Sequence, residues 1–228
     1  MLLVHNSFGD LKDWDGWVGV LRKYYRLVRS DLPAFGLTGN VPSGNYSIDR
    51  YLTLVDALMD HLGIEHFAIV GPSYGGLVAF RYAATRVDRI SALVLANSAG
   101  VECGGRRGSA ERTCNTARFC SSEVKTGASL EATLKGLIND PAKVTPEMVH
   151  RKTDYGNVIG RNREAFIETQ LYERRSPHRV LSHVRAPALG RCKSESVIRD
   201  RAGHRRCDEE CAEHAGDHLR RRWASPAH

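Results

Sequence analysis

The chain has 228 residues, of which 42% are hydrophobic and 26% are charged, which is enough apolar surface for one sizeable domain. No stretch of the sequence approaches the roughly 18 consecutive apolar residues that a membrane span needs. Six cysteines are few for a chain of this length. These figures exclude a transmembrane protein and a disordered chain, and they count against a disulfide-stapled miniprotein.

The formal net charge of +7 is unevenly distributed. Residues 1–100 carry nine basic and nine acidic side chains and no cysteine, so the whole excess of positive charge lies beyond them. The start, Met1–Val4, has no basic flank and no cleavage site of a secretory signal. We therefore expect a cytoplasmic location with free thiols. All six cysteines fall in two arginine-rich stretches and are Cys103, Cys114, Cys120, Cys192, Cys207 and Cys211.

Short apolar strands alternate with amphipathic helices in the first hundred residues. The clearest helix begins after Ser47, which can cap it, carries apolar residues at helical spacing from Ile48 to Leu62, and ends at Gly63. Strands that are apolar on both faces are typical of a parallel sheet covered by helices on both sides. The sequence predicts an α/β fold of this kind. The expected strands are Leu2–Val4, Arg26–Val28, Phe67–Val70 and Ala92–Ala96.

The sharpest motif is Gly71-Pro72-Ser73-Tyr74-Gly75, between an expected strand and an expected helix. A side chain on a very tight strand-to-helix turn projects above the sheet, and only small residues fit two positions before and after it. The following helix directs its free N–H groups and its positive end toward the same point. The spacing predicts that Ser73 is a nucleophile and that the N–H of Tyr74 donates to a developing oxyanion.

Three landmarks in order resemble the α/β-hydrolase superfamily. Residues 2–9 (Leu-Leu-Val-His-Asn-Ser-Phe-Gly) resemble its strand and oxyanion loop, residues 31–36 (Asp-Leu-Pro-Ala-Phe-Gly) its glycine-rich turn, and residues 71–75 its nucleophile elbow. The resemblance resumes at about residues 129–175, which look like part of a helical cap. It implies a mostly parallel sheet flanked by helices, with a cap over the active site.

The resemblance also implies roles for individual residues. Ser73 would be the nucleophile, and the backbone N–H groups of Tyr74 and Ser7 would form the oxyanion hole. His5 would be structural in the loop and not the catalytic base. A serine at position 73, instead of a carboxylate, argues against the dehalogenase and epoxide-hydrolase branches. It favours hydrolysis of a small-molecule ester, lactone, thioester or C–C bond through an acyl-enzyme, with no cofactor and no metal.

The sequence departs from the family pattern in its first half at Asn6 and Ala34, which replace glycines of the family. If position 6 requires a positive φ, asparagine is the best-tolerated substitute. The chain also begins at what would be the family's third strand, so we expect an incomplete sheet with an uncovered edge.

The catalytic base and its orienting acid are harder to find. In this family the acid and then the histidine follow the serine along the chain, and residues 183–189 resemble the entry to the acid-bearing strand. Residues 190–228, however, hold only three of the larger aliphatic or phenylalanine residues, and we expect no buried strand there. Glu195, with Asp200 as an alternative, is the candidate acid, and His204 is the candidate base.

Residues 101–125 and 190–228 share an enrichment in Arg, Cys and Gly or His. One hypothesis is that both are out-of-frame translations of an ordinary hydrolase gene, which the other two reading frames of the coding DNA would test. The predicted organisation is a core over residues 1–100, a helical cap over 101–180, and a poorly ordered remnant of the C-terminal core over 181–228.

Three other interpretations remain open. The series His204, Cys207, Cys211 and His214 has zinc-ligand chemistry, although a continuous helix would spread these residues over about 15 Å. Arg220–Trp223 offers a basic, aromatic segment, but no recognised nucleic-acid module is present, so we expect neither a nucleic-acid nor a membrane partner. The third is a catalytically impaired hydrolase fold that serves as a binding module. The sequence leaves the substrate and the oligomeric state open.

Overall fold

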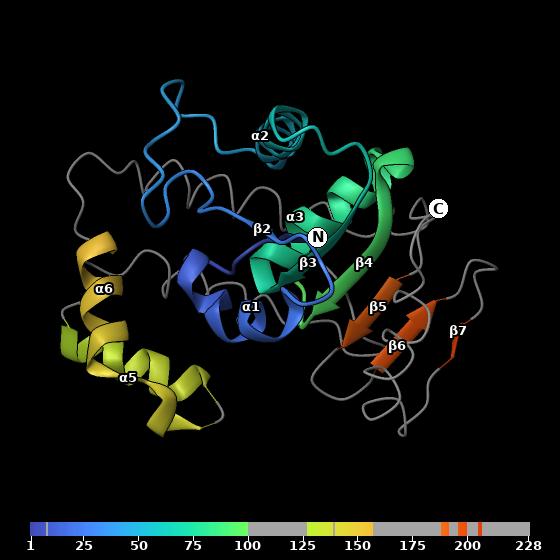
Figure 1. The fold of residues 1–228 in the computed structure, drawn as a ribbon. Helices are drawn as coiled ribbons and strands as arrows, with labels where there is room; N and C mark the ends of the chain where they lie inside the picture. Colours follow the sequence, from blue (N-terminus) through green and yellow to red (C-terminus); the bar gives the residue numbers. More distant parts are fainter. Residues whose placement is uncertain are drawn as a thin grey trace, which may run out of the picture.

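The computed structural model describes residues 1–7, 9–99, 127–138, 140–156, 188–191, 196–199 and 205–206. Within them, strands and helices alternate as the sequence predicts (Figure 1). No helix of these residues is long and apolar enough to cross a membrane. The elements in chain order are β1 (Leu2–Leu3), η1 (Leu11–Trp14), α1 (Asp15–Leu21), β2 (Val28–Arg29), α2 (Ile48–His61), β3 (Phe67–Pro72), α3 (Ser73–Thr85), η2 (Val87–Arg89), β4 (Ile90–Ala96), α5 (Gly127–Leu137), η3 (Pro141–Lys143), α6 (Pro146–Gly156), β5 (Ala188–Arg191), β6 (Ser196–Arg199) and β7 (Arg205–Arg206).

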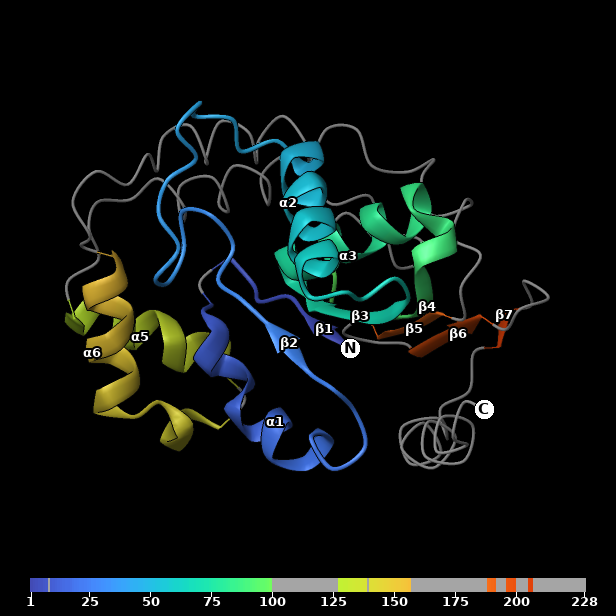
Figure 2. The ribbon, with the colours of Figure 1, turned by 45° about the horizontal axis from the view of Figure 1, so that its top comes forward.

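The strands form one sheet in the order β2-β1-β3-β4-β5-β6-β7. The pairs from β2 to β5 are parallel, and the β5–β6 and β6–β7 pairs are antiparallel. Helices α2 and α3 cover one face of the sheet and α1 lies on the other (Figure 2). The predicted α/β architecture with a mostly parallel, incomplete sheet is therefore confirmed.

Helix α2 follows the sequence pattern closely. The Ser47 hydroxyl accepts a hydrogen bond from the Arg50 N–H at 3.3 Å, which satisfies one free donor of the first turn. Gly63 takes a left-handed φ of 65° just after the helix, a conformation that glycine adopts without steric cost. The apolar face of the helix is buried against the sheet and consists of Ile48, Tyr51, Leu52, Val55 and Met59.

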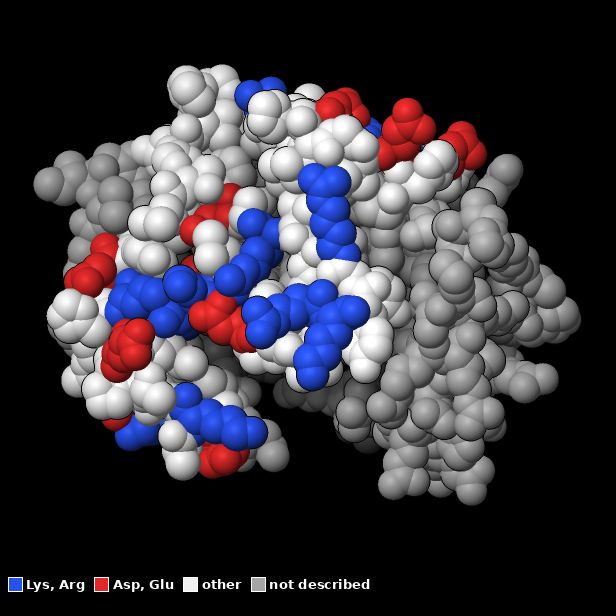
Figure 3. All heavy atoms as spheres, in the orientation of Figure 1, with Lys and Arg blue, Asp and Glu red and all other residues white. Residues whose placement is uncertain are grey.

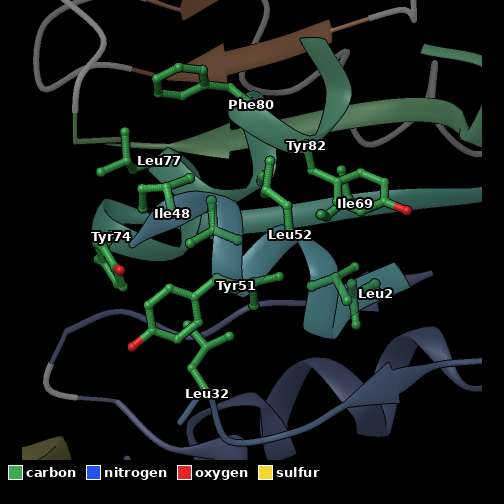
Figure 4. Close-up of a cluster of buried hydrophobic side chains, with 14 of the residues drawn as sticks. Leu2, Leu32, Ile48, Tyr51, Leu52, Ile69, Tyr74, Leu77, Phe80 and Tyr82 are labelled. Atoms are coloured by element: carbon green, nitrogen blue, oxygen red, sulfur yellow. The ribbon is translucent and has the colours of Figure 1, made fainter. Parts of the chain in front are cut away.

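Most buried side chains belong to one cluster between the sheet and helices α2 and α3 (Figure 4). A smaller cluster of Leu3, Trp14 and Val70 packs on the other face, where Trp14 of η1 and Val18 of α1 cover the sheet. Successive residues of a strand point to opposite faces of the sheet, so Leu2 and Ile69 enter the main cluster and Leu3 and Val70 enter the smaller one. The two faces explain why β1, β3 and β4 are apolar at consecutive positions.

Helices α5 and α6 form a separate unit. Their shared core contains Leu130, Leu134, Val144 and Val149, which belong to neither of the clusters on the sheet. In both ribbon views the pair lies at the opposite end of the molecule from β5–β7 (Figures 1 and 2). This unit falls inside the expected cap, residues 101–180, whose remaining parts at 101–126 and 157–180 lie outside the described residues.

The sheet ends in three short strands, β5, β6 and β7. Strand β5 runs parallel to β4, with Arg191 opposite Ala96, as expected for the strand after residue 183. Strands β6 and β7 follow as short antiparallel strands, and the expectation that residues 190–228 hold no buried strand stays a prediction. Main-chain hydrogen bonding pairs strands without a run of apolar side chains, and Val197 and Ile198 supply two of the few apolar residues in this segment.

Candidate active site

The strand-to-helix turn lies where the sequence predicts it. Strand β3 ends at Pro72 and helix α3 begins at Ser73. Ser73 has a φ of 48°, which is the left-handed region that costs a non-glycine residue about 1–2 kcal/mol. Such strain persists only where the surrounding structure imposes it, and it concentrates at functional sites.

The glycines on either side of Ser73 are required by close backbone approach. A Cβ on Gly71 would overlap the main chain of Gly75 and Gly76. A Cβ on Gly75 would lie 2.5 Å from the carbonyl oxygen of His5 and would overlap that of Val4. The elbow therefore contacts the loop after β1 backbone to backbone, which brings the predicted oxyanion loop beside Ser73.

The loop after β4 supports the elbow from a third side. The Ala99 N–H donates to the carbonyl oxygen of Ser73 at 2.8 Å. Asn97 turns this loop with a φ of 51°, a conformation that asparagine tolerates better than most residues. A Cβ on Gly76 would lie 2.5 Å from the Ser98 hydroxyl oxygen. This support is not predicted from the sequence, where its only local signal is the second glycine of the Gly75-Gly76 pair.

His5 is buried and locked in one tautomer. Its Nε2 accepts a hydrogen bond from the Leu32 N–H at 2.9 Å, so the ring proton is on Nδ1, which donates to the Asn6 carbonyl oxygen at 2.8 Å. Burial lowers the pKa of the imidazole, outweighing its hydrogen bond to Asn6 and the nearby carboxylates of Asp31, Asp13 and Asp10. Because one nitrogen is bonded to the backbone of the loop and the other to the backbone of the turn at residues 31–36, the geometry agrees with a structural role for His5.

The turn at residues 31–36 is built around the Asp31 carboxylate. One oxygen accepts from the Leu11 N–H at 2.7 Å and the other from the Leu37 N–H at 2.8 Å. Gly36 has a φ of 45°, and a Cβ there would overlap this carboxylate. The turn thus ties β2 to the segment that follows the oxyanion loop, because Leu11 is the first residue of η1.

The two departures from the family pattern have different outcomes. Ala34 has a φ of 70°, so alanine occupies a left-handed position here. Asn6 does not have a positive φ, so the condition under which its replacement of glycine would matter does not arise. Of the two positions where the family has glycine, only Ala34 therefore carries left-handed backbone strain.

Tyr74 anchors the first turn of α3 in the main core. Its side chain is fully buried and lies beside Tyr51 (Figure 4), with 5.9 Å between the two ring centroids. The ring centroid of Phe35 lies 6.5 Å from that of Tyr74. Phe35 in turn meets the His5 ring edge-on at 5.1 Å. Aromatic contacts of this kind stabilise a packed arrangement beyond area burial alone. They pack the elbow, the turn at residues 31–36 and the oxyanion loop against one another.

A partly buried ion cluster connects α6 to the segment after the oxyanion loop. Lys152 Nζ lies 3.1 Å from the Asp10 carboxylate and 2.8 Å from that of Asp13, and Arg151 Nε lies 3.3 Å from Asp10. Burial alone would raise the pKa of the Asp10 carboxyl, but the charges of Lys152 and Arg151 and the Lys12 N–H hold it below its ordinary value. Acidic and basic side chains interleave between α1 and α6 on the molecular surface (Figure 3).

A model of the family described as the alpha/beta hydrolase fold matches residues 1–113. The chain belongs to this family. The match covers the three sequence landmarks and both loops that meet at Ser73. The elbow and the loops around it are therefore the part of this α/β hydrolase that the family shares.

Curated relatives match part of the chain. Haloalkane dehalogenase 2 of Mycobacterium tuberculosis is 32% identical over 78 residues, which are 34% of this chain and 27% of that protein. The 2-hydroxymuconate semialdehyde hydrolase of Pseudomonas sp. strain CF600 is 31% identical over 104 residues, which are 44% of this chain and 37% of that protein. The matches thus span well under half of the length of these relatives.

Solved structures agree in fold. A hydrolase from Pseudomonas aeruginosa PA01 matches with a TM-score of 0.63 and 24% identity, covering 83% of this chain and 69% of that one. The 2-hydroxy-6-oxo-6-phenylhexa-2,4-dienoate hydrolase from Rhodococcus sp. strain RHA1 matches with a TM-score of 0.68 and 20% identity, covering 83% and 70%. These likenesses extend the fold assignment beyond the residues that the family model matches.

The predicted acid and base fall outside the part of the chain that the structure describes. Glu195, Asp200 and His204 lie outside the described residues, as do the zinc-like series from His204 to His214 and the segment Arg220–Trp223. Within the described part of the chain, no group of three or more metal-ligating side chains comes together. The predicted acid and base therefore stay predictions.

Proposed function

We propose that the chain is a serine hydrolase that cleaves a small-molecule ester, lactone or C–C bond through an acyl-enzyme on Ser73. The observation that carries this proposal is the left-handed backbone of Ser73 at the first residue of α3. That strain is maintained by glycine-mediated backbone contacts with the loop after β1. A merely solvated serine in an ordinary turn would not need it.

In the proposed mechanism, the Ser73 hydroxyl oxygen attacks the substrate carbonyl and its proton passes to a base. The N–H groups of Tyr74 and Ser7 hold the oxyanion of the tetrahedral intermediate. Collapse of the intermediate expels the leaving group, which takes up the proton from the base. Water then attacks the acyl-enzyme, releases the acid product and restores Ser73. The reaction needs no metal or cofactor.

For the base and its orienting acid we propose His204 and Glu195. Strand β5 is parallel to β4 and ends at Arg191, opposite Ala96, which is itself opposite Pro72. The carboxyl ends of parallel strands meet at one edge of a sheet, so β5 ends at the edge that carries Ser73. Glu195 follows β5 by four residues in the sequence. This topology supports a carboxylate from this connection as the acid.

Among the relatives, the nucleophile favours one kind of chemistry over the other. The dehalogenase and epoxide-hydrolase branches use a carboxylate as nucleophile, whereas this chain has serine at position 73. The match to a 2-hydroxymuconate semialdehyde hydrolase supports C–C bond or ester hydrolysis instead.

We also propose that the α5–α6 unit is part of a cap, because its separate core adjoins η1 through the cluster of Asp10 and Lys152. The cytoplasmic location stays a prediction.

A second candidate function is a binding module with an impaired triad. The composition of residues 190–228 favours it, because only three of these 39 residues are Val, Ile, Leu, Met or Phe, whereas the family's base follows a buried strand. A serine without its base keeps part of its reactivity through the oxyanion hole, so weak turnover alone does not separate the two functions.

A fluorophosphonate probe tests the proposal directly, since it labels only activated serines. We expect stoichiometric labelling of the wild-type chain and none of Ser73→Ala. His204→Gln should reduce the labelling rate by at least 100-fold, as expected for loss of a triad base. The matched control His150→Gln changes an exposed histidine on α6 and should leave the rate unchanged. An unlabelled wild type would support the binding module.

A further inference from the structure

We propose that His5 is a positioning residue that orients the Ser7 N–H toward the oxyanion of the Ser73 reaction. This inference rests on the proposed function, because it deals with one of the two donors of the proposed oxyanion hole. It assigns His5 a specific contribution to the reaction, through one peptide group, in place of a general structural role.

The carbonyl group of Asn6 is held from two sides. Its oxygen accepts two hydrogen bonds, from His5 Nδ1 at 2.8 Å and from the Gly9 N–H at 3.0 Å. Both donors lie within the loop, so they draw this carbonyl into the loop interior. A carbonyl held by two donors cannot rotate without breaking both bonds.

The orientation of Ser7 N–H follows from the peptide bond. The described residues contain no cis peptide bond, and in a planar trans peptide the C=O and the following N–H point in opposite directions. Fixing the Asn6 carbonyl toward the loop interior therefore fixes the Ser7 N–H away from it. The backbone of Gly75 packs against the carbonyl groups of Val4 and His5, which keeps the loop and the elbow in register.

The His5 ring can do this only as the Nδ1–H tautomer. That tautomer is selected by the Leu32 N–H, which donates to Nε2 at 2.9 Å. Leu32 is adjacent to Asp31, whose carboxylate anchors the turn through Leu11 and Leu37. A continuous series of hydrogen bonds thus runs from this turn through the imidazole to the Asn6–Ser7 peptide.

Two amide substitutions separate the two bonds of the ring. Asparagine at position 5 offers an N–H at about the place of Nδ1, so it retains the bond to the Asn6 oxygen. Glutamine offers an oxygen at about the place of Nε2, so it retains the bond from Leu32 and loses the donor to Asn6. The pair is matched in polarity and charge. A purely structural role in the turn predicts that glutamine is the better substitute.

The first measurement compares fluorophosphonate labelling rates at equal folded fractions, checked by thermal melting. We expect His5→Asn to stay within about fivefold of the wild type and His5→Gln to fall by about 10- to 100-fold, because removing one oxyanion donor altogether costs 10²–10³-fold. Equal rates in the two variants, or a faster His5→Gln, would overturn the proposal.

The second measurement does not depend on activity, so it also decides the case of an unlabelled wild type, in which the proposed function fails. Imidazole ¹⁵N spectra of the wild type should show a proton on Nδ1 and none on Nε2 at neutral pH. The backbone amide signal of Ser7 should shift in His5→Gln and stay near its wild-type position in His5→Asn. A proton on Nε2, or a Ser7 amide that moves equally in both variants or in neither, contradicts the proposal.

Discussion

Gly75→Ala tests the contact between the nucleophile elbow and the loop after β1. The new Cβ would lie 2.5 Å from the His5 carbonyl oxygen and would overlap that of Val4. Both neighbours are main-chain atoms, one in β1's immediate continuation and one in the oxyanion loop, so neither can move aside as a flexible side chain would. The loop and the first turn of α3 must therefore separate.

The size of the effect follows from comparing two opposing contributions. Replacing glycine by alanine inside a helix stabilises the protein by about 1 kcal/mol through helix propensity, whereas inserting a methyl group into a packed site costs about 1–3 kcal/mol. Gly19→Ala in α1 is the matched control, because a Cβ there meets nothing within 4 Å. We expect Gly19→Ala to raise the free energy of unfolding above that of the wild type. The free energy of unfolding of Gly75→Ala should be about 1–3 kcal/mol lower than that of Gly19→Ala.

Urea unfolding of the two variants measures this difference, and fluorophosphonate labelling measures its effect on Ser73. We expect Gly75→Ala to label at least tenfold more slowly, since a displaced loop no longer holds its N–H donor in place. Equal stabilities of the two variants, with unchanged labelling, would refute the described contact between elbow and loop.

Three further predictions concern the surroundings of the site. Lys152→Met removes one of two cations from the buried Asp10 carboxylate and should lower the free energy of unfolding by about 1–3 kcal/mol in urea melts. This is less than the loss of about 3–5 kcal/mol on breaking an isolated buried pair, because Arg151 remains. The control Lys135→Met removes a cation from an exposed pair and should cost under about 1 kcal/mol. Because burial lowers the pKa of His5 below 6.5, the unfolded chain binds the extra proton first. Stability should therefore fall by about 1.4 kcal/mol per pH unit from pH 6.5 down to the lowered pKa, and His5→Asn should show a flatter pH profile over that window; parallel profiles would contradict a buried neutral imidazole. Ala34→Gly relieves about 1–2 kcal/mol of left-handed strain against similar losses from chain entropy and a buried methyl, so thermal melting should find it within about 1 kcal/mol of the wild type, which a loss of 2 kcal/mol or more would contradict.

The local features of the fold were predictable because each depends on neighbouring residues. The apolar run in β3, the helical spacing of α2 with Ser47 before it, and the glycines around Ser73 all act over a few positions. Boundaries were less exact: the strand expected at Arg26–Val28 is observed at Val28–Arg29. The bounds of β2, a strand of only two residues, are set by its pairing with β1, and local sequence does not predict that pairing.

The contacts that the sequence did not predict join distant parts of the chain. Asp10 and Lys152 are 142 residues apart, and each taken alone is an ordinary charged residue on a helical segment. The Ser73–Ala99 hydrogen bond and the His5–Leu32 hydrogen bond likewise depend on how loops from separate strands meet. A local sequence pattern therefore predicts which residues belong to the site, but it does not predict their hydrogen-bond or ion-pair partners from distant parts of the chain. The acid and base, Glu195 and His204, remain predictions because they lie outside the described residues.

The central claim is that Ser73 is an activated nucleophile held by its elbow. Intact-mass spectrometry of the whole chain after fluorophosphonate treatment, with peptide mapping of the adduct, tests this claim most directly. We expect one adduct per chain, located on Ser73, and none in Ser73→Ala. An unmodified wild type, or an adduct on another serine that persists in Ser73→Ala, would contradict it.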